Sequence, residues 1–245
     1  MKDNFSNQSA AYSKYRPGYP QELFDFILQF VSIRNLAWDA GTGNGQTAAA
    51  LARYFTKVFA TDISRQQLNN AIIDHNILYA PEPAENTSLA DASVNLITVS
   101  QALHWFNFND FYAEVKRVAA PGAVIAVWSY SLLKIDASID ALLHQYHYKT
   151  LGNYWDAERK FVDDAYTTIP FPFKEIATPS FEIKMNWNLQ ELRGYLNTWS
   201  ALQKFIAANG YSPVQALIEE MSKYWPAGQI KQISFPLHLK MGKVQ

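Results

Sequence analysis

The sequence predicts an α/β protein in which a mostly parallel sheet of seven strands carries helices on both faces. Two observations predict this fold. Apolar stretches of strand length alternate with amphipathic stretches of helix length from residue 36 to residue 131, and this alternation is typical of parallel strands joined by crossover helices. A glycine-rich segment, "LAWDAGTGNGQT", also joins the first of these strands to a helix. Beyond residue 131 the alternation breaks, which predicts a helical cap inserted before the last two strands.

The first half of the chain contains five predicted strands and four predicted helices. A helix comes first, because Leu23, Phe24 and Ile27 follow helical spacing in "YPQELFDFILQFVS". Ser64 and Gln67 have the spacing of a capping box, which predicts a helix that begins at residue 65. The strands are expected at residues 35–40, 57–64, 76–80, 93–100 and 123–131, the other helices at 46–55 and 108–118, and a Pro-Gly turn at 121–122.

The second half is predicted to be mainly helical, with two further strands. Asn188 and Glu191 form a second capping box. Helices are expected at residues 136–151, 189–199 and 213–225, an irregular proline-rich stretch at 167–179, and strands at 181–187 and 233–242. We therefore expect one domain in four parts: an N-terminal lid and helix (1–35), a cofactor-binding core (36–131), the cap insertion (132–180) and C-terminal strands and helices (181–245).

Composition and charge exclude several classes of protein. The net charge is −1 and no basic run occurs, so we expect no nucleic acid partner and no attraction to an anionic membrane. The chain has no cysteine, which excludes disulfides, thiol catalysis and cysteine-based metal sites. The polar N-terminus does not resemble a signal peptide and no apolar run is long enough to span a bilayer, so a cytoplasmic location is expected.

The glycine spacing argues against a bound phosphate. The dinucleotide pattern requires its third glycine three places after the second, but Gly45 lies two places after Gly43. A phosphate loop requires a lysine that is absent here. Asp39, at the end of the strand, would repel a phosphate and attract a cationic group. S-adenosylmethionine fits these requirements, because it has no phosphate and carries an ammonium group.

Two further acidic positions fit the same ligand. Asp62 ends the second predicted strand, where a carboxylate can accept hydrogen bonds from both ribose hydroxyls, and Ala84 and Glu85 follow the third, where an adenine edge would lie. Ligands bind at the carboxyl ends of the strands in parallel sheets, and all these positions lie there. The alternative, a tight turn that only leads into a helix, explains the glycines but not the acidic residues.

At this point the sequence resembles a known family, the class I S-adenosylmethionine-dependent methyltransferases. The motifs "DAGTGNGQ", "ATDIS" and "AENTSLADASVNLITVSQALHWF" carry the resemblance, and "YSKYRPGYP" with "QALHWF" is similar to the group around trans-aconitate methyltransferase, the methyltransferase type 11 group. The resemblance implies a Rossmann-like fold, S-adenosyl-L-methionine as cofactor and S-adenosyl-L-homocysteine as product. The motifs and the resemblance together predict cofactor contacts at Tyr12, Asp39, Ala40, Gly41, Thr42, Gly43, Gln46, Asp62, Ile63, Gln67, Ala84, Glu85, Ser100 and Gln101.

The candidate catalytic residues are His104, Trp105 and Arg16. His104 and Trp105 follow the fourth strand at the edge that carries the glycines, where they would lie beside the transferable methyl group; the alternative is a packed His-Trp corner. The resemblance implies that the segment around Arg16 folds over the cofactor as a lid, whereas a polar terminus more often forms a solvated arm. Arg16 would then bind an acceptor carboxylate.

We therefore predict an enzyme that methylates a small molecule, with a carboxylate oxygen of a small organic acid as the acceptor. The alternatives are O- or N-methylation of a phenol or amine, a non-catalytic protein that binds S-adenosylmethionine, and an NAD-dependent oxidoreductase. The partner is expected to be the small-molecule substrate, and the protein a monomer or homodimer. His144 and His147 have the i, i+3 spacing of metal ligands, but no carboxylate motif accompanies them, so no metal is predicted. Two alternatives, the core and the substrate pocket, stay open for four aromatic residues: Tyr195, Trp199, Trp128 and Tyr130.

Overall fold

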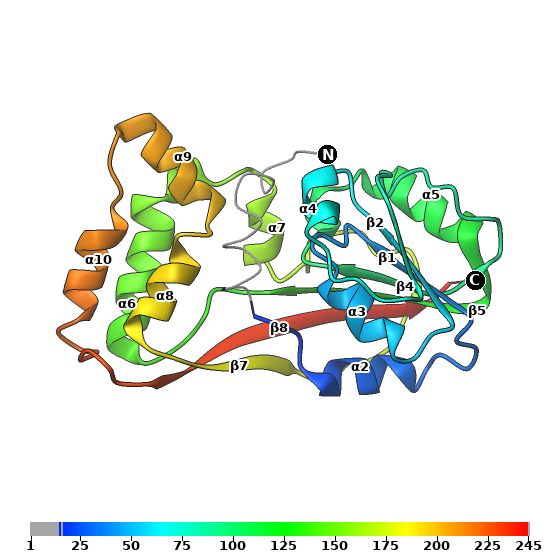
Figure 1. Cartoon of the computed structure of the whole chain (residues 1–245), viewed down its shortest axis with the longest axis horizontal. Coiled ribbons are helices and arrows are strands. Elements are labelled where there is room, and N and C mark those ends of the chain that lie inside the picture. The colour runs from blue at the N-terminus through cyan, green and yellow to red at the C-terminus, as the bar shows by residue number, and fades with distance from the viewer. Residues whose placement is uncertain (1–14, 16, 245) are drawn as a thin grey trace.

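The structure, a computed structural model, describes residue 15 and residues 17–244 (Figure 1). Tyr12 and Arg16 therefore lie outside the described residues. None of the described helices is long and apolar enough to cross a membrane.

The predicted elements of the first half are all present. Several of their boundaries differ from the prediction. The helix expected at 46–55 ends at Ala52, the strand expected at 57–64 ends at Thr61, and the helix capped by Ser64 ends at Asn69. The fifth strand begins at Ala119, because the expected Pro-Gly turn lies inside the strand, beside a register shift in its pairing. The elements are α2 (Gln21–Leu28), β1 (Leu36–Ala40), α3 (Gln46–Ala52), β2 (Lys57–Thr61), α4 (Arg65–Asn69), β3 (Ile77–Ala80), β4 (Val94–Ser100), a 3-10 turn (Leu103–Trp105), α5 (Phe108–Val118) and β5 (Ala119–Tyr130).

The second half contains the predicted elements and several that were not predicted. The additional ones are a five-residue helix, a ten-residue helix, a two-residue strand and irregular turns, which are too short or too weakly periodic to identify from sequence. The elements are α6 (Ala137–Gln145), a π turn (Tyr146–Thr150), a 3-10 turn (Gly152–Tyr154), α7 (Arg159–Asp163), β6 (Lys174–Glu175), β7 (Phe181–Trp187), α8 (Leu189–Leu196), α9 (Ser200–Asn209), α10 (Val214–Met221) and β8 (Lys231–Lys243).

The sheet confirms the predicted mixed α/β fold. Its eight strands have the order β3-β2-β1-β4-β5-β8-β6, and β7 also pairs with β8. Strands β1 to β5 pair in parallel, whereas β8 runs antiparallel to β5, β6 and β7. Because β6 pairs with Lys243 and Gly242 and β7 pairs with residues 231–237 of β8, the two short strands share one edge. The sheet is therefore seven strands wide.

Apolar side chains alternate along the central strands and cover both faces of the sheet. Ala37 and Leu96 belong to the cluster that contains α2 and α3, while Trp38 and Ile97, one residue further along each strand, belong to the cluster that contains α5. This alternation follows from the period of two in a strand. Helices therefore pack on both faces, as predicted.

The helical cap is assembled from two segments of the chain. We use "cap" for residues 132–173, which contain α6 and α7, together with residues 188–230, which contain α8, α9 and α10. These helices stand together beyond one end of the sheet, with α7 between the others and the core (Figure 1). Tyr146 contacts Trp199, with ring centroids 6.2 Å apart, and both side chains are buried. The apolar face of each segment is therefore covered by the other.

Asp39 joins three segments at the carboxyl end of β1. Its side chain is fully buried. Thr42 donates a hydrogen bond to Oδ2 (2.5 Å) and Thr98 of β4 donates one to Oδ1 (2.8 Å). Burial raises the pKa of Asp39 to about 6, against these hydrogen bonds and one from the backbone N–H of Ala48 in α3. At neutral pH the carboxylate is therefore ionised in an apolar surrounding, and it is held by β4, α3 and the chain that follows β1.

The raised pKa of Asp39 predicts a measurable pH dependence of stability. A folded pKa above the unfolded value contributes stability at low pH, and this stability is lost as the pH rises through about 6. Asp39→Asn removes the titration, so the difference in unfolding free energy between wild type and variant should change by about 1–2 kcal/mol from pH 5 to pH 8 in favour of the variant. Urea unfolding at both pH values measures it. The exposed Asp110→Asn is the control, and a pH-independent difference for Asp39→Asn would contradict the assignment.

Candidate functional site

Three glycines allow the loop after β1 to turn back onto β2. In this glycine loop, residues 41–45, Gly41, Gly43 and Gly45 have φ of 67°, 56° and 80°, which side chains other than glycine disfavour. A Cβ at Gly41 would lie 2.7 Å from the Cβ of Ala102, and one at Gly45 would lie 2.1 Å from the hydroxyl of Tyr79. At Gly43, by contrast, no atom lies within 4 Å of a Cβ position. The loop is therefore packed at its two ends and open in the middle.

Asp62 connects the glycine loop to the loop that follows β2. Its Oδ2 accepts a hydrogen bond from the N–H of Gly43 (2.9 Å), and its Oδ1 accepts one from the N–H of Ser64 (2.8 Å). Ser64 in turn caps α4 through the N–H of Gln67 (3.3 Å). The N–H of Ser64 thus bonds to Asp62. Of the two hydrogen bonds of the predicted capping box, only the one from the N–H of Gln67 to the Ser64 side chain forms. Asp62 is partly exposed, and a carboxylate oxygen can accept more than one hydrogen bond.

The other described residues that were predicted to bind the cofactor lie at the same edge of the sheet. We call this the cofactor edge, and it consists of the carboxyl ends of β1 to β5. Glu85 accepts a hydrogen bond from the N–H of Asn107 (2.9 Å), which caps α5, and Thr47 donates one to Ser100 (3.0 Å). The loop after β3 is therefore fixed to the start of α5, and the end of β4 is fixed to α3. Four of these residues are buried, namely Ala40, Thr42, Gln67 and Ala84. Five are partly exposed, namely Gln46, Ile63, Glu85, Ser100 and Gln101.

Gln101, directly after β4, adopts a backbone conformation that is unusual for its residue type. Its φ is 55°, a left-handed value that is uncommon for residues other than glycine and is found most often at functional sites. Three hydrogen bonds hold it there: its N–H donates to the carbonyl of Trp128 (2.8 Å), and its side-chain oxygen and nitrogen bond the N–H (2.9 Å) and carbonyl (3.4 Å) of Tyr130. Strand β5 thus fixes the turn that leads to His104.

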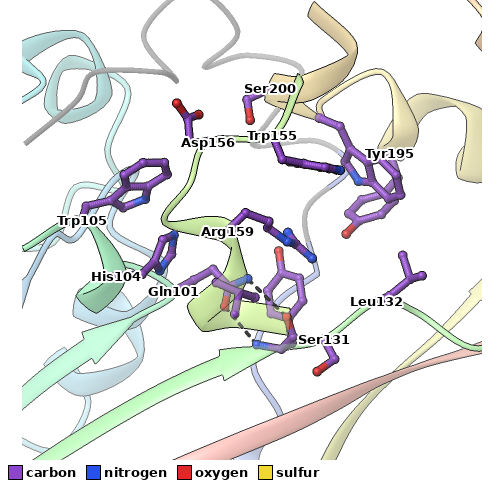
Figure 2. Close-up of a pocket in the computed structure, with 13 residues that line it drawn as sticks. Gln101, His104, Trp105, Ser131, Leu132, Trp155, Asp156, Arg159, Tyr195 and Ser200 are labelled. Atoms are coloured by element: carbon purple, nitrogen blue, oxygen red, sulfur yellow. Dashed lines mark hydrogen bonds between the residues drawn. The ribbon is translucent and has the colours of Figure 1, made fainter. Parts of the chain in front are cut away.

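A pocket lies between the cofactor edge and the cap. Gln101, His104 and Trp105 line it from the core, and Trp155, Arg159 and Tyr195 line it from the cap (Figure 2). Its volume is about 70 Å³. The structure thus brings His104 and Trp105 to one wall of a pocket whose opposite wall comes from residues at least fifty positions later in the chain.

His104 is buried and neutral. Its side chain is 7% exposed, and its Nδ1 lies 2.7 Å from the hydroxyl oxygen of Tyr166. Burial lowers the pKa of His104 to about 3, and the nearby positive charge of Arg159 contributes to this. Its ring also packs on Trp105, with centroids 4.7 Å apart. The residue is therefore both a packed corner and part of the pocket wall.

Arg159 is a cationic residue of the pocket that the sequence interpretation missed. Its Nε donates a hydrogen bond to Asp163 (2.9 Å), and its guanidinium carbon lies 4.8 Å from the ring centroid of Trp155. Among residues 17–244, no hydrogen bond from its two terminal nitrogens is found. Figure 2 shows the side chain extending into the pocket between His104 and Tyr195. The only available signal was the four-residue spacing of Trp155 and Arg159, which is weak outside a predicted helix.

The acidic residue of the pocket wall is paired with a cation. Asp156 accepts a hydrogen bond from Lys204 of α9 (2.6 Å). This ion pair offsets the negative charge of Asp156, so the positive charge of Arg159 is not offset by Asp156 as well. Arg159 is itself paired with Asp163 through Nε, so what the pocket offers to an anionic group is the donors of its two terminal nitrogens rather than an unbalanced positive charge.

Two tyrosines just before α2 contact the cap and the core, respectively. The ring of Tyr15 packs on Gly194 of α8, where a Cβ would lie 2.4 Å from Tyr15 Cε1, and Tyr19 contacts Trp128 edge-on with centroids 5.4 Å apart. Tyr12 and Arg16 lie outside the described residues, so the lid that was predicted from this segment stays a prediction.

The two histidines with metal-ligand spacing pack among aromatic side chains. His147 is fully buried and stacks on Trp155, with centroids 4.7 Å apart, and His144 contacts Tyr148 at 4.5 Å. In the part of the chain that the structure describes, no three His, Asp or Glu side chains form a group that could hold a metal ion.

Sequence and structure comparisons identify the family to which this site belongs. Residues 38–127 match the methyltransferase domain family. A methyltransferase of Dictyostelium discoideum is 34% identical over 249 residues, which covers 98% of this chain and 95% of the relative. An S-adenosylmethionine-dependent methyltransferase of Saccharomyces cerevisiae is 27% identical over 139 residues, or 53% of this chain and 47% of the relative.

A solved structure extends the match to nearly the whole fold. A type II methyltransferase from Anaeromyxobacter dehalogenans superposes with a TM-score of 0.87 at 35% identity, covering 94% of this chain and 98% of that one. The residues at the cofactor edge fit the ligand that this family uses, because an open glycine loop and a partly exposed carboxylate at the end of β2 suit an adenosine without phosphates. The chain is an enzyme that belongs to the class I S-adenosylmethionine-dependent methyltransferases.

Proposed function

We propose that this methyltransferase acts on a carboxylate oxygen of a small organic acid held between the cofactor edge and the cap. Asp62 would accept hydrogen bonds from the ribose of the cofactor, the glycine loop would lie against its methionine end, and Ala84 and Glu85 would lie near the adenine. Asp39 and the remaining predicted contacts complete this proposed cofactor site.

The chemistry requires alignment more than acid–base catalysis. When bound, the cofactor supplies a methyl group on a positively charged sulfur; the carboxylate oxygen bonds to the methyl carbon as the carbon–sulfur bond breaks, which gives a methyl ester and neutral S-adenosylhomocysteine. A carboxylate is already ionised at pH 7, so no proton has to be removed. Orientation of the acceptor and exclusion of water then supply most of the rate.

The low pKa of His104 is the observation that carries the choice of acceptor. A general base works best when its pKa is close to the working pH. His104, with a pKa lowered to about 3 by burial, is poorly matched to removing a proton from a phenol or an ammonium group at neutral pH. A neutral imidazole can still donate one hydrogen bond to a carboxylate.

Arg159 supports an anionic acceptor from the other wall of the pocket. A guanidinium has donors in a fork that matches a carboxylate, and Trp155 and Asp163 already restrict where this guanidinium lies. In this proposal Arg159 therefore binds the anion. The sequence had suggested Arg16 for this role.

The size and walls of the pocket support a small acceptor. A cavity of about 70 Å³ has room for about five water molecules. Trp105, Trp155 and Tyr195 supply apolar walls that exclude water from an attacking oxygen.

The first prediction of this proposal concerns the cofactor. A hydrogen bond to a charged group contributes about 1.5–3 kcal/mol, so Asp62→Ala should weaken binding of S-adenosylhomocysteine at least about tenfold. Isothermal titration calorimetry measures the affinity, and a melting curve checks that the variant is folded, because Asp62 also holds Gly43 and Ser64. Asp110→Ala, at an exposed carboxylate of α5, should leave the affinity unchanged. Wild-type affinity in folded Asp62→Ala would contradict the ribose assignment.

The second prediction concerns the acceptor. Di- and tricarboxylic acids should yield methyl esters in a screen that also contains phenols and amines, with release of S-adenosylhomocysteine as the readout. Arg159→Met should raise KM for the acid about 10–150-fold, because a charged hydrogen bond is lost. Lys160→Met, an exposed cation in the same helix, is the matched control. Methylation of only phenols or amines would show that the carboxylate proposal is wrong.

The third prediction concerns His104. His104→Gln should retain activity on the acid within about tenfold of wild type, since the amide also donates a hydrogen bond, whereas His104→Leu should lose more. Because the pKa of His104 is about 3, kcat/KM should show no titration of this residue between pH 5 and pH 9. A loss of about 10²–10⁴ in His104→Gln would instead identify His104 as a general base.

A further inference from the structure

Tyr166 contacts the pocket only through His104. Its side chain is fully buried, and its hydroxyl oxygen lies 2.7 Å from Nδ1 of His104. Among residues 17–244, no other group bonds it. The hydroxyl is therefore wholly engaged with one residue that lines the pocket.

This contact and the burial of the hydroxyl determine where the protons lie. Burial raises the pKa of Tyr166 well above its ordinary value, so the phenol keeps its proton. In this enclosed position Nδ1 of His104 is the acceptor for that proton, because the opposite arrangement would leave a buried hydroxyl without an acceptor. The single proton of the neutral imidazole is then on Nε2.

The backbone around Tyr166 is strained in a way that fixes its direction. Ala165 and Tyr166 have φ of 54° and 58°, left-handed values that single non-glycine residues adopt only when neighbouring structure imposes them. The N–H of Tyr166 donates to the carbonyl of Phe161 (2.8 Å), and Lys240 of β8 donates to the carbonyls of Tyr166 (3.2 Å) and Ile169 (3.3 Å). The strained turn ends α7, the helix that carries Arg159.

A neighbouring tyrosine shows what a packing role alone looks like. Tyr112 is also buried, and its hydroxyl donates to the backbone carbonyl of Pro170 (2.6 Å). The hydrogen bond of the Tyr112 hydroxyl is thus made to the backbone and involves no residue of the pocket. Tyr166 lies four residues before Pro170 in the same loop, but the partner of its hydroxyl is the side chain of His104.

We propose that Tyr166 is a positioning residue that holds His104 in the tautomer with the proton on Nε2, so that the ring offers a hydrogen-bond donor to the methyl acceptor. The donor role of His104 rests on the proposed function, but the tautomer itself does not. Lys240, by holding the strained turn, sets the direction of the tyrosine.

The tautomer can be measured directly by NMR. The chain has five histidines, and His104→Gln identifies the His104 signals in a ¹⁵N–¹H correlation spectrum of the imidazole rings. Wild type should show His104 neutral, with Nε2 protonated and Nδ1 accepting. In Tyr166→Phe the Nδ1 shift should move towards that of a mixture of tautomers, whereas Tyr112→Phe should leave it unchanged. A wild-type His104 with the proton on Nδ1, or an unchanged spectrum in Tyr166→Phe, would overturn the proposal.

Kinetics separate a positioning role from a structural one. Tyr166→Phe should lower kcat/KM for the acceptor about 3–10-fold, the effect of one hydrogen bond, while the affinity for S-adenosylhomocysteine stays the same. In a His104→Ala background the same substitution should change kcat/KM less than about twofold. An equal loss in both backgrounds, or an equal loss in Tyr112→Phe, would mean that Tyr166 only packs. If neutral acceptors alone react, the carboxylate proposal fails while the NMR result still decides the tautomer.

Discussion

The buried carboxylate of Asp39 connects β1, β4 and the start of α3 at the place where the glycine loop begins. An ionised group in an apolar surrounding is unfavourable unless hydrogen bonds compensate it, so the positions of Thr42 and Thr98 are closely constrained. Thr42 in turn begins the turn that exposes Gly43 and brings it to Asp62. The geometry of the cofactor edge thus depends on one charge whose burial the surrounding strands make possible.

The pocket combines two walls that come from different parts of the chain. On the core side, the left-handed turn at Gln101 and the hydrogen bonds to β5 direct His104 towards the cap. On the cap side, α7 carries Arg159, and the strained turn after α7 carries Tyr166 back to His104. One short helix therefore supplies both the cation of the pocket and, through the turn that ends it, the contact that orients the neutral imidazole.

Local signals in the chain were sufficient for the core and for α6, α8 and α10 of the cap, but insufficient for α7 and α9 and for the way in which the cap is assembled. Alternation of apolar residues and capping pairs such as Asn188 with Glu191 depends on neighbours in sequence, and the structure confirms the strands and that capping box. Ser64 is a partial exception, because its N–H bonds to Asp62. Helices as short as α7 carry too few residues for a periodic pattern. No local sequence pattern indicates that two separate segments join to form one cap.

The sequence by itself determined the α/β fold, the glycine loop and the family, because each depends on residue types at fixed local spacing. It also identified His104 and Trp105 as candidates, since they directly follow a strand that ends at the cofactor edge. Only the tertiary structure decided that His104 is neutral, that Tyr166 is its partner and that Arg159 is a cation of the pocket. These properties arise from burial and from contacts between residues about sixty positions apart, and such contacts exist only once the cap has packed against the core.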